Sequence, residues 1–590
     1  MTPSISPSGP GRTSRTRRPL VLVLVVVLVG GLLAGTGWYV AARRTGGGSA
    51  RTATTGASGG ASGTAGGRGG GTATTAASGG GTATAGVPGA VGTGDAARTW
   101  RDAVRAENAL TGTPGWRIGS TAGKHPGLQV YADRVSVRPG EPVGLYVDGD
   151  GPVAVRALRM GDYSGVGARQ VWTGTVTATR QPAATVGQGP ISDAGGIRGT
   201  RLVVAPWHRS GTVDTTGWPE GHYLLRVDGA TASRYVPLTV RSADARGRLL
   251  VVASAMTWQA YNAWGGGSLY DGDDGRFDDR SLAVSFDRPY ADGYGSGRFL
   301  SYDAQIVRLA ERAGLPVAWA TDYDLATRPE LLDGATGIVI GGHAEYWTGP
   351  MRDAVTAQVA RGANLAVLGA NTAYWRVRLA GAGTALPGQP DRRDGRPRVI
   401  VGAKNAHLDP LAATDPGGAT ARFRDTPSPR AEEALTGMRY DCFPAETSWT
   451  VTDPGWWGYA GTGVRAGERL EGVVGPEADR VYPVAGRPRP MEIVAYQPYS
   501  CGPSSRTVHT GVYWVAPSGA GVFTAGTMRW PCATEPGCTG VPGTRTAAVV
   551  AGVTTNVLTA FAEPLAGRAH PATDTVDRFT LSARGTTKAA

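Results

Sequence analysis

Residues 301–369 read SYDAQIVRLAERAGLPVAWATDYDLATRPELLDGATGIVIGGHAEYWTGPMRDAVTAQVARGANLAVLG, and helical and extended patterns alternate along them. The segment 301–313 places Tyr302, Ile306 and Leu309 on one helical face, and Gly314 ends it. The runs PVAWA, TGIVIGG and NLAVLG lack polar alternation, which is typical of strands buried on both faces. This order predicts a mostly parallel sheet with helices on both sides.

The same pattern continues on both sides of this stretch. RLLVVAS (248–254) is another apolar strand, and MEIVAYQP (491–498), TGVYWVAP (510–517) and AGVFTAGT (520–527) could extend or close the sheet. We therefore expect residues 246–565 to form a layered α/β domain of the flavodoxin-like or class I amidotransferase-like type, followed by a tail over residues 566–590.

Residues 97–245 carry a different pattern. Short apolar strands recur between turns rich in Pro and Gly, among them LQVYADRVSV (128–137), PVGLYVDG (142–149), HYLLRVDG (222–229) and RYVPLTVR (234–241). Strands at this spacing without intervening helices predict a β-sandwich domain ahead of the α/β domain.

The N-terminal residues 1–96 cannot join a packed core. Residues 20–42 form an uncharged apolar run that, at about 1.5 Å per residue, could cross a bilayer as a transmembrane helix. An arginine-rich segment, residues 1–19, precedes it and predicts a cytoplasmic basic tail. Residues 43–96 are a Gly/Ala/Thr/Ser tract, which predicts a disordered stalk. We expect a single-pass membrane protein with an extracellular body; the alternative is a cleaved signal peptide and a secreted protein.

The charge of the chain gives little sign of nucleic-acid binding. The formal net charge is +12, but no dense Lys/Arg block or recognisable nucleic-acid module stands in the body of the chain. We therefore expect no nucleic-acid partner.

All four cysteines lie in about the last quarter of the chain. An even number of cysteines in an exported protein predicts disulfides. Cys532 and Cys538 close a short loop containing Pro-Gly, and Cys442 with Cys501 follows by elimination. Neither CxxC nor HxxxH spacing is present, so a zinc site is not expected.

Aromatic and polar side chains follow four of the expected parallel strands at the point where each ends. They stand in TWQAYNAWGGGSLYDGDDG (257–275), TDYDL (321–325), HAEYW (343–347) and ANTAYWRVR (370–378). Ligands bind beyond the carboxyl ends of the strands in such sheets. We expect a crevice there, which His343 and Glu345 reach from one tight turn.

These segments resemble a known family. AYNAWGGGSLY, TDYDL, GGHAEYW and GANTAYWRVR, followed by Lys404 and Asp409-Pro410, are similar to the C-terminal part of the large (beta) subunit of N,N-dimethylformamidase. The resemblance covers residues 247–565, and the preceding segment is similar to one that accompanies this domain in secreted bacterial relatives. It implies an amidohydrolase whose mononuclear iron is held by two tyrosines and a glutamate, with a histidine close by.

The resemblance also implies roles for particular residues. Glu345 matches the glutamate ligand, His343 matches the neighbouring histidine, and both are the expected catalytic residues. Tyr261 is the expected first tyrosine ligand. Tyr223 is the expected second one, although alternation in its strand GHYLLRV also fits core packing. The substitutes for Tyr223 are Tyr302 and Tyr346.

Such a site is consistent with elementary chemistry. Phenolate and carboxylate are hard oxygen donors that suit a hard cation. A tyrosine, with an ordinary pKa of about 10, ionises at neutral pH only beside strong positive charge. An open metal position would polarise an amide carbonyl and acidify a bound water.

Further residues of these turns are candidates for substrate binding. Trp264, Trp347 and Trp375 could form an apolar wall for a ligand. Asn371 stands near the position where amidotransferase relatives place a nucleophile, but an amide cannot act as one. We expect Asn371 and the three tryptophans to contact the substrate.

The sequence as a whole predicts a membrane-anchored, extracytoplasmic, iron-dependent hydrolase of C–N bonds in a small amide or another small molecule. The alternative is a non-catalytic cell-surface protein that binds a glycan or peptide in the same aromatic crevice. The chain could also form a homo-oligomer.

Overall fold

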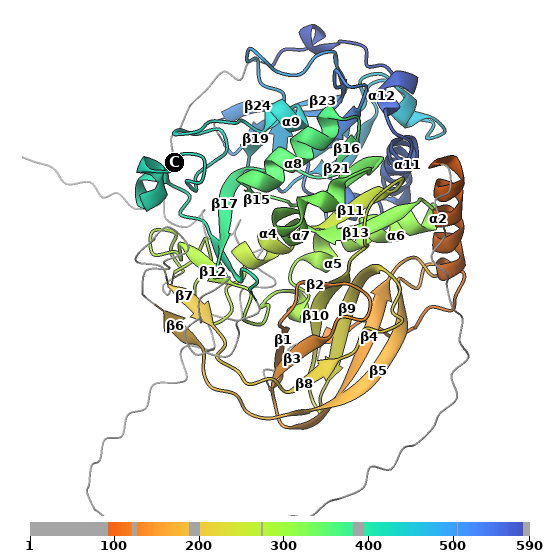
Figure 1. Cartoon of the computed structure of the whole chain (residues 1–590). Coiled ribbons are helices and arrows are strands. Elements are labelled where there is room, and N and C mark those ends of the chain that lie inside the picture. Colours follow the sequence, from red (N-terminus) through yellow and green to blue (C-terminus); the bar gives the residue numbers. More distant parts are fainter. Residues whose placement is uncertain are drawn as a thin grey trace, which may run out of the picture. The chain divides into compact units, whose positions relative to one another are not determined.

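A computed structural model describes residues 93–120, 127–187, 201–272, 275–381, 395–503 and 505–581. All of these residues belong to one compact unit, Pro88–Ala590. It begins with helix α2 (Thr93–Asn108), which packs against α6 (Ala304–Arg312) (Figure 1).

The predicted membrane anchor and membrane location are corrected here. No helix in the described ranges is long and apolar enough to cross a bilayer. The predicted basic tail and transmembrane segment, residues 1–42, and the predicted stalk up to residue 92 lie outside those ranges. A single-pass membrane protein is therefore not supported.

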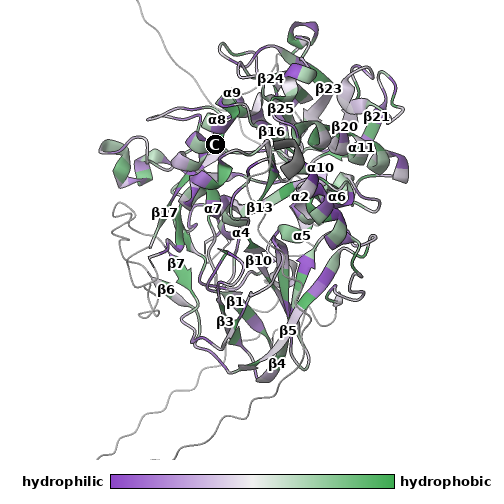
Figure 2. Cartoon of the chain, turned by 45° about the vertical axis from the view of Figure 1, so that its right-hand side comes forward, coloured by the Kyte–Doolittle hydropathy of each residue, from purple (hydrophilic) through white to green (hydrophobic). Residues whose placement is uncertain are grey.

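Two sheets form around one apolar core in the first part of the described chain (Figure 1). The first has the order β1-β3-β8, with β1 Gln129–Ala132, β3 Val143–Asp148 and β8 Gly211–Val213. The second has the order β2-β10-β9-β4-β5, with β2 Ser136–Val137, β10 Ser233–Val240, β9 Gly221–Asp228, β4 Gly151–Met160 and β5 Ala168–Ala178. Buried Val155 and Ala157 flank the less buried Arg156 in β4. Figure 2 shows hydrophobic and hydrophilic residues interleaved along the strands of these sheets.

The largest sheet has seven strands in the order β13-β11-β14-β16-β25-β24-β23. The first five are parallel: β13 Val317–Thr321, β11 Leu249–Ala253, β14 Gly337–Ile340, β16 Asn364–Val367 and β25 Gly521–Thr524. The last two, β24 (Ser505–Val515) and β23 (Met491–Cys501), pair antiparallel.

The expected flavodoxin-like or class I amidotransferase-like fold is therefore wrong. The large sheet is mixed, and several smaller mixed or antiparallel sheets accompany it. Only residues 502–504 separate β23 from β24, which is too short for the crossover that a parallel pair requires. The apolar runs in these strands fit either pairing, so their composition did not reveal the direction.

Both faces of the seven-stranded sheet are covered by helices. Val251 and Val339 pack on one face with α6 and α11 (Thr544–Phe561), whereas Leu250 and Ile338 pack on the other with α7 (Asp322–Thr327) and α8 (Gly349–Ala360). Successive residues of a strand point to opposite faces, which explains why these strands are apolar throughout.

Between β16 and β23 the chain leaves the large sheet, and smaller sheets and short helices form beside it. β17 (Trp375–Ala380) joins β12, β15 and β18 in a four-stranded sheet, in which β12 is Ala283–Ser285, β15 Tyr346–Thr348 and β18 Val399–Val401. Two-stranded sheets form from β6 Thr185–Gly187 with β7 Leu202–Val204, β19 Arg439–Cys442 with β22 Ala478–Arg480, and β20 Thr447–Thr450 with β21 Arg469–Val474. The short helices are α4 Ala255–Ala260, α5 Phe299–Tyr302, α9 Glu433–Thr436, α10 Trp530–Ala533 and α12 Ala566–Ala569.

The predicted disulfides are confirmed. Cys442 is bonded to Cys501 and Cys532 to Cys538, so every cysteine of the chain is paired. The first bond closes a long loop, with a sequence separation of 59, around the chain between β19 and β23. Such a link restricts the unfolded chain and so stabilises this part of the protein.

Candidate functional site

Two neighbouring parallel strands position the central residues of the site. β11 leads into α4, and Tyr261 follows directly. β14 leads into a tight turn that carries His343 and Glu345. The hydroxyl of Thr257 in α4 accepts hydrogen bonds from the backbone N–H groups of Glu345 (3.0 Å) and Tyr346 (3.3 Å). Helix α4 therefore fixes the turn that carries Glu345.

Two tyrosine hydroxyls converge on the Glu345 carboxylate. Tyr261 donates a hydrogen bond to Oε2 at 2.7 Å, and Tyr270 donates one to Oε1 at 2.7 Å. The two hydroxyl oxygens are 3.1 Å apart, and the rings stack with centroids separated by 4.5 Å. Glu345 is only 1% exposed. The structure thus brings Tyr261 and Glu345 together, and it adds Tyr270 beside them.

We call Tyr261, Tyr270 and Glu345 the triad, and its electrostatics depend on whether a cation is present. Burial raises the pKa of Tyr261 and of Tyr270 well above its ordinary value, and the charge of Glu345 raises both further. Without a cation both phenols therefore stay protonated and donate to Glu345. A hard cation among the three oxygens would favour the phenolate forms, and this donor set fits such an ion.

The phenols are needed for any such ion. Across the ranges that the structure describes, no group of three His, Cys, Asp or Glu side chains could hold a metal. A metal ion at this position would therefore need the phenol oxygens as ligands beside Glu345.

A histidine and a second glutamate lie beside the triad. His343 is 1% exposed, and its Nε2 lies 3.5 Å from Oε2 of Glu345 and 3.5 Å from Oε2 of Glu477. Neither ring nitrogen of His343 makes a hydrogen bond to any described residue. An imidazole without such a partner could bond a water that reaches it and move a proton.

A large cavity opens onto this site. Its volume is about 1250 Å³, and its walls include Tyr261, Tyr270, Glu345 and Glu477. Asn371, one of the predicted substrate-binding residues, lines it too. Its backbone N–H donates to Oδ1 of Asp479 at 2.9 Å, while its side-chain Oδ1 has no hydrogen-bond partner among the described residues.

The predicted tryptophans divide between the cavity and the interior. Trp375 lines the cavity. Trp347 is fully buried in the core that α7 and α8 cover, and Trp264 makes an edge contact with Trp207 at 5.7 Å. Neither of these two is among the residues that line the cavity. Their aromatic character reflects packing, which local sequence does not distinguish from ligand contact.

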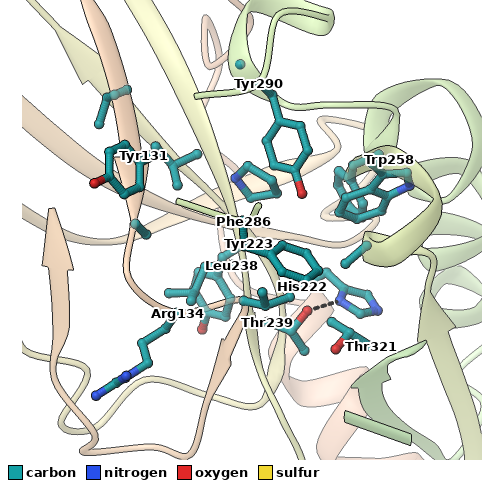
Figure 3. A pocket seen from close by; sticks show the side chains of 18 of the residues that line it. Tyr131, Arg134, His222, Tyr223, Leu238, Thr239, Trp258, Phe286, Tyr290 and Thr321 are labelled. Atoms are coloured by element: carbon teal, nitrogen blue, oxygen red, sulfur yellow. Dashed lines mark hydrogen bonds between the residues drawn. The ribbon is translucent and has the colours of Figure 1, made fainter. Parts of the chain in front are cut away.

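The structure does not place Tyr223 with Tyr261 and Glu345. Its hydroxyl donates to the backbone oxygen of Pro219 at 2.7 Å, and its ring stacks on Trp218 in the core of the first two sheets. It lines a separate cavity of about 30 Å³, which has room for little more than a water molecule or two (Figure 3). Tyr223 therefore lies in the core of these two sheets, apart from Tyr261 and Glu345, as the alternation in its strand indicated.

The two substitutes for Tyr223 border the triad. The Tyr346 ring meets the rings of Tyr261 and Tyr270 edge-on, with centroids 6.2 and 6.5 Å away. The Tyr302 ring lies 5.8 Å from that of His343. Only Tyr270, however, shares the Glu345 carboxylate with Tyr261 through a hydrogen bond of its own.

A buried carboxyl group near the site should make stability depend on pH. Asp303 accepts a hydrogen bond from Nε1 of Trp258 at 3.2 Å, and burial raises its pKa to about 8. The unfolded pKa is about 3.9, so the folded state binds more protons between about pH 4 and 8. This contribution to stability is complete below about pH 4 and is lost as the pH rises towards 8.

We therefore expect the wild type to lose stability relative to Asp303→Asn between pH 5 and 8, by at most about 1.4 kcal/mol per pH unit. Denaturant unfolding of both proteins across this range measures the difference. Asp279→Asn, at an exposed position, is the control and should run parallel to the wild type. Parallel curves for wild type and Asp303→Asn would contradict the expectation.

Comparison with known proteins identifies the family of the chain. Residues 154–540 match the family described as N,N-dimethylformamidase beta subunit-like, C-terminal. No curated protein matches the chain. The match includes the triad, His343 and Glu477. Because it covers more than half of the chain, the protein belongs to the N,N-dimethylformamidase beta subunit-like family.

Proposed function

We propose that this protein hydrolyses the C–N bond of amides with a mononuclear iron held by Tyr261, Tyr270 and Glu345. Membership of the family supports a hydrolase-like role. The observation that carries the finer proposal is the convergence of two phenol oxygens on one buried carboxylate, at 2.7 Å each. The two phenols that donate to this carboxylate would become phenolate ligands if a hard cation bound among the three oxygens.

Iron bound by these three residues would supply a Lewis acid that polarises the amide carbonyl and acidifies a water. The chain itself supplies the proton transfers. His343, with both ring nitrogens free of protein partners, accepts a proton from the attacking water and returns it to the leaving nitrogen. Glu477, 3.5 Å from His343, stabilises the charged imidazolium between these two transfers.

The cavity wall orients the substrate for this reaction. The unpaired side-chain oxygen of Asn371 can accept a hydrogen bond from a substrate N–H, and the Trp375 ring offers an apolar surface. Holding the amide in one pose beside His343 makes the attack effectively unimolecular.

The test of this proposal is the metal content of the purified protein. We expect about one iron per chain in the wild type, with visible absorption from iron-phenolate charge transfer, and loss of both in Tyr270→Phe and Tyr261→Phe. Tyr223→Phe is the matched control, because it removes a buried hydroxyl outside the site and should keep the iron. Equal iron in all four proteins, or none in the wild type after anaerobic and aerobic preparation, would refute the proposed centre.

A further inference from the structure

Two cations on the cavity wall lack acidic partners. Lys404 and Arg280 both line the cavity, and neither forms an ion pair with any carboxylate of the described residues. The other two arginines of the wall are neutralised, since Arg422 pairs with Asp425 at 2.6 Å and Arg424 with Glu432 at 2.7 Å. Among the Lys and Arg side chains of the wall in the described ranges, Lys404 and Arg280 are therefore the two without an ion-paired carboxylate.

Lys404 is buried in an aromatic cage. Its Nζ lies 3.0 Å from the centre of the Tyr270 ring and 5.0 Å from that of Trp375. The residue is 8% exposed, and Nζ has no hydrogen-bond partner among the described residues. A buried ammonium is costly unless an anion compensates it, and no described side chain supplies one at Nζ.

Hydrogen bonds hold Arg280 beside the segment that carries Lys404. Its Nη2 donates to the backbone oxygen of Ala403 at 3.0 Å, and its Nη1 donates to that of Phe277 at 3.1 Å. Its Nε has no partner in the described part of the chain. These bonds fix the guanidinium beside the segment that carries Lys404, so the two positive charges face the cavity together.

The size and the rim of the cavity indicate what kind of molecule it can bind. Pockets of about 300–1,000 Å³ hold drug-sized ligands, so a cavity of about 1250 Å³ is far larger than dimethylformamide requires. Phe277, Leu408 and Phe443 line it and are 47, 47 and 56% exposed. An apolar group that reaches this rim would cover these side chains.

We infer that the substrate is an amide with a carboxylate close to the scissile C–N bond and a sizeable apolar group, as in an N-acylated amino acid, and that Lys404 and Arg280 bind the carboxylate. This inference rests on the proposed amide hydrolysis. The carboxylate lies close to the scissile bond because Lys404 stands on the face of Tyr270, whose hydroxyl binds Glu345. An ionised carboxylate bound by two cations forms charge-assisted hydrogen bonds, which are the stronger kind.

The experiment compares N-benzoylglycine with N-methylbenzamide, which has the same scissile bond but no carboxylate. Benzoate release gives kcat and KM for the wild type, Arg280→Gln, Arg280→Lys and the surface control Arg246→Gln, with iron measured on each preparation. We expect a preference of about tenfold to a hundredfold in kcat/KM for N-benzoylglycine in the wild type. In Arg280→Gln this preference should fall about tenfold, because KM for N-benzoylglycine rises. Arg280→Lys should restore part of the preference, because it keeps the positive charge.

The outcomes separate the inference from the proposed function. Equal kcat/KM for the two amides in the wild type, or an unchanged ratio in Arg280→Gln, overturns the carboxylate subsite while amide hydrolysis stands. If the iron-loaded protein hydrolyses neither amide, binding of N-benzoylglycine is measured by calorimetric titration. Binding by the wild type that is weaker in Arg280→Gln would support the carboxylate subsite and contradict the proposed amide hydrolysis. Absence of both hydrolysis and binding overturns the inference.

Discussion

Glu345→Gln should remove the bound iron and lower amide hydrolysis by about a hundredfold to a thousandfold. Glu345 is the only acid that accepts both Tyr261 and Tyr270 among the described residues, at 2.7 Å each. A glutamine of the same shape offers no negative charge to a cation, and its amide group would compete with the phenols as a donor. Elemental analysis, visible absorption and kcat/KM measure the three effects.

The matched control for this prediction is Glu563→Gln, at an exposed residue that pairs with Arg101. It should keep both iron and activity. Circular dichroism of each variant checks that the fold is intact. Full iron content in Glu345→Gln would show that the iron is bound elsewhere.

Glu311→Leu should lower the free energy of unfolding by about 3–5 kcal/mol. Glu311 in α6 and Arg159 in β4 are 1 and 3% exposed, and they join at 2.5 Å (Nη2–Oε1) and 3.0 Å (Nη1–Oε2). Removing the glutamate leaves a buried guanidinium without its main partner. Denaturant unfolding, followed by circular dichroism and tryptophan fluorescence, measures the change.

The double variant Arg159→Met/Glu311→Leu tests the cause. Replacing both charges by apolar side chains of similar volume should restore most of the stability, because no unpaired charge remains. If the double variant is as unstable as Glu311→Leu, lost packing rather than an unpaired charge explains the effect.

The sequence revealed the local elements better than the way in which they pair. Helix α8 begins after Thr348, a residue type that commonly caps helices, and the Thr348 hydroxyl accepts the N–H of Met351 at 3.2 Å. By contrast, the single helix expected over 301–313 is divided into α5 and α6 around Asp303, whose carboxyl is buried against Trp258. That interaction joins residues far apart in the chain, so helical periodicity could not indicate it.

The site was predictable only where its residues follow parallel strands. Tyr261 and Glu345 come directly after such strands, and the shared edge brings them together. Tyr270 stood in the GGGSLY motif, but nothing in a loop rich in glycine indicates which way its side chain points. Glu477 lies outside any strand or helix just before β22, in the long stretch between β16 and β23 that leaves the large sheet, where no periodic pattern leads to the site.

Helix α11 has a practical bearing on how the protein can be shortened. The family match ends at residue 540, whereas α11 occupies Thr544–Phe561, with Val550, Val553 and Phe561 almost inaccessible to water. A truncation at the family boundary would remove this helix from the sheet and expose an apolar surface that promotes aggregation. Expression clones that stop at the edge of sequence similarity should therefore yield insoluble material, even though every residue of the candidate centre would still be encoded.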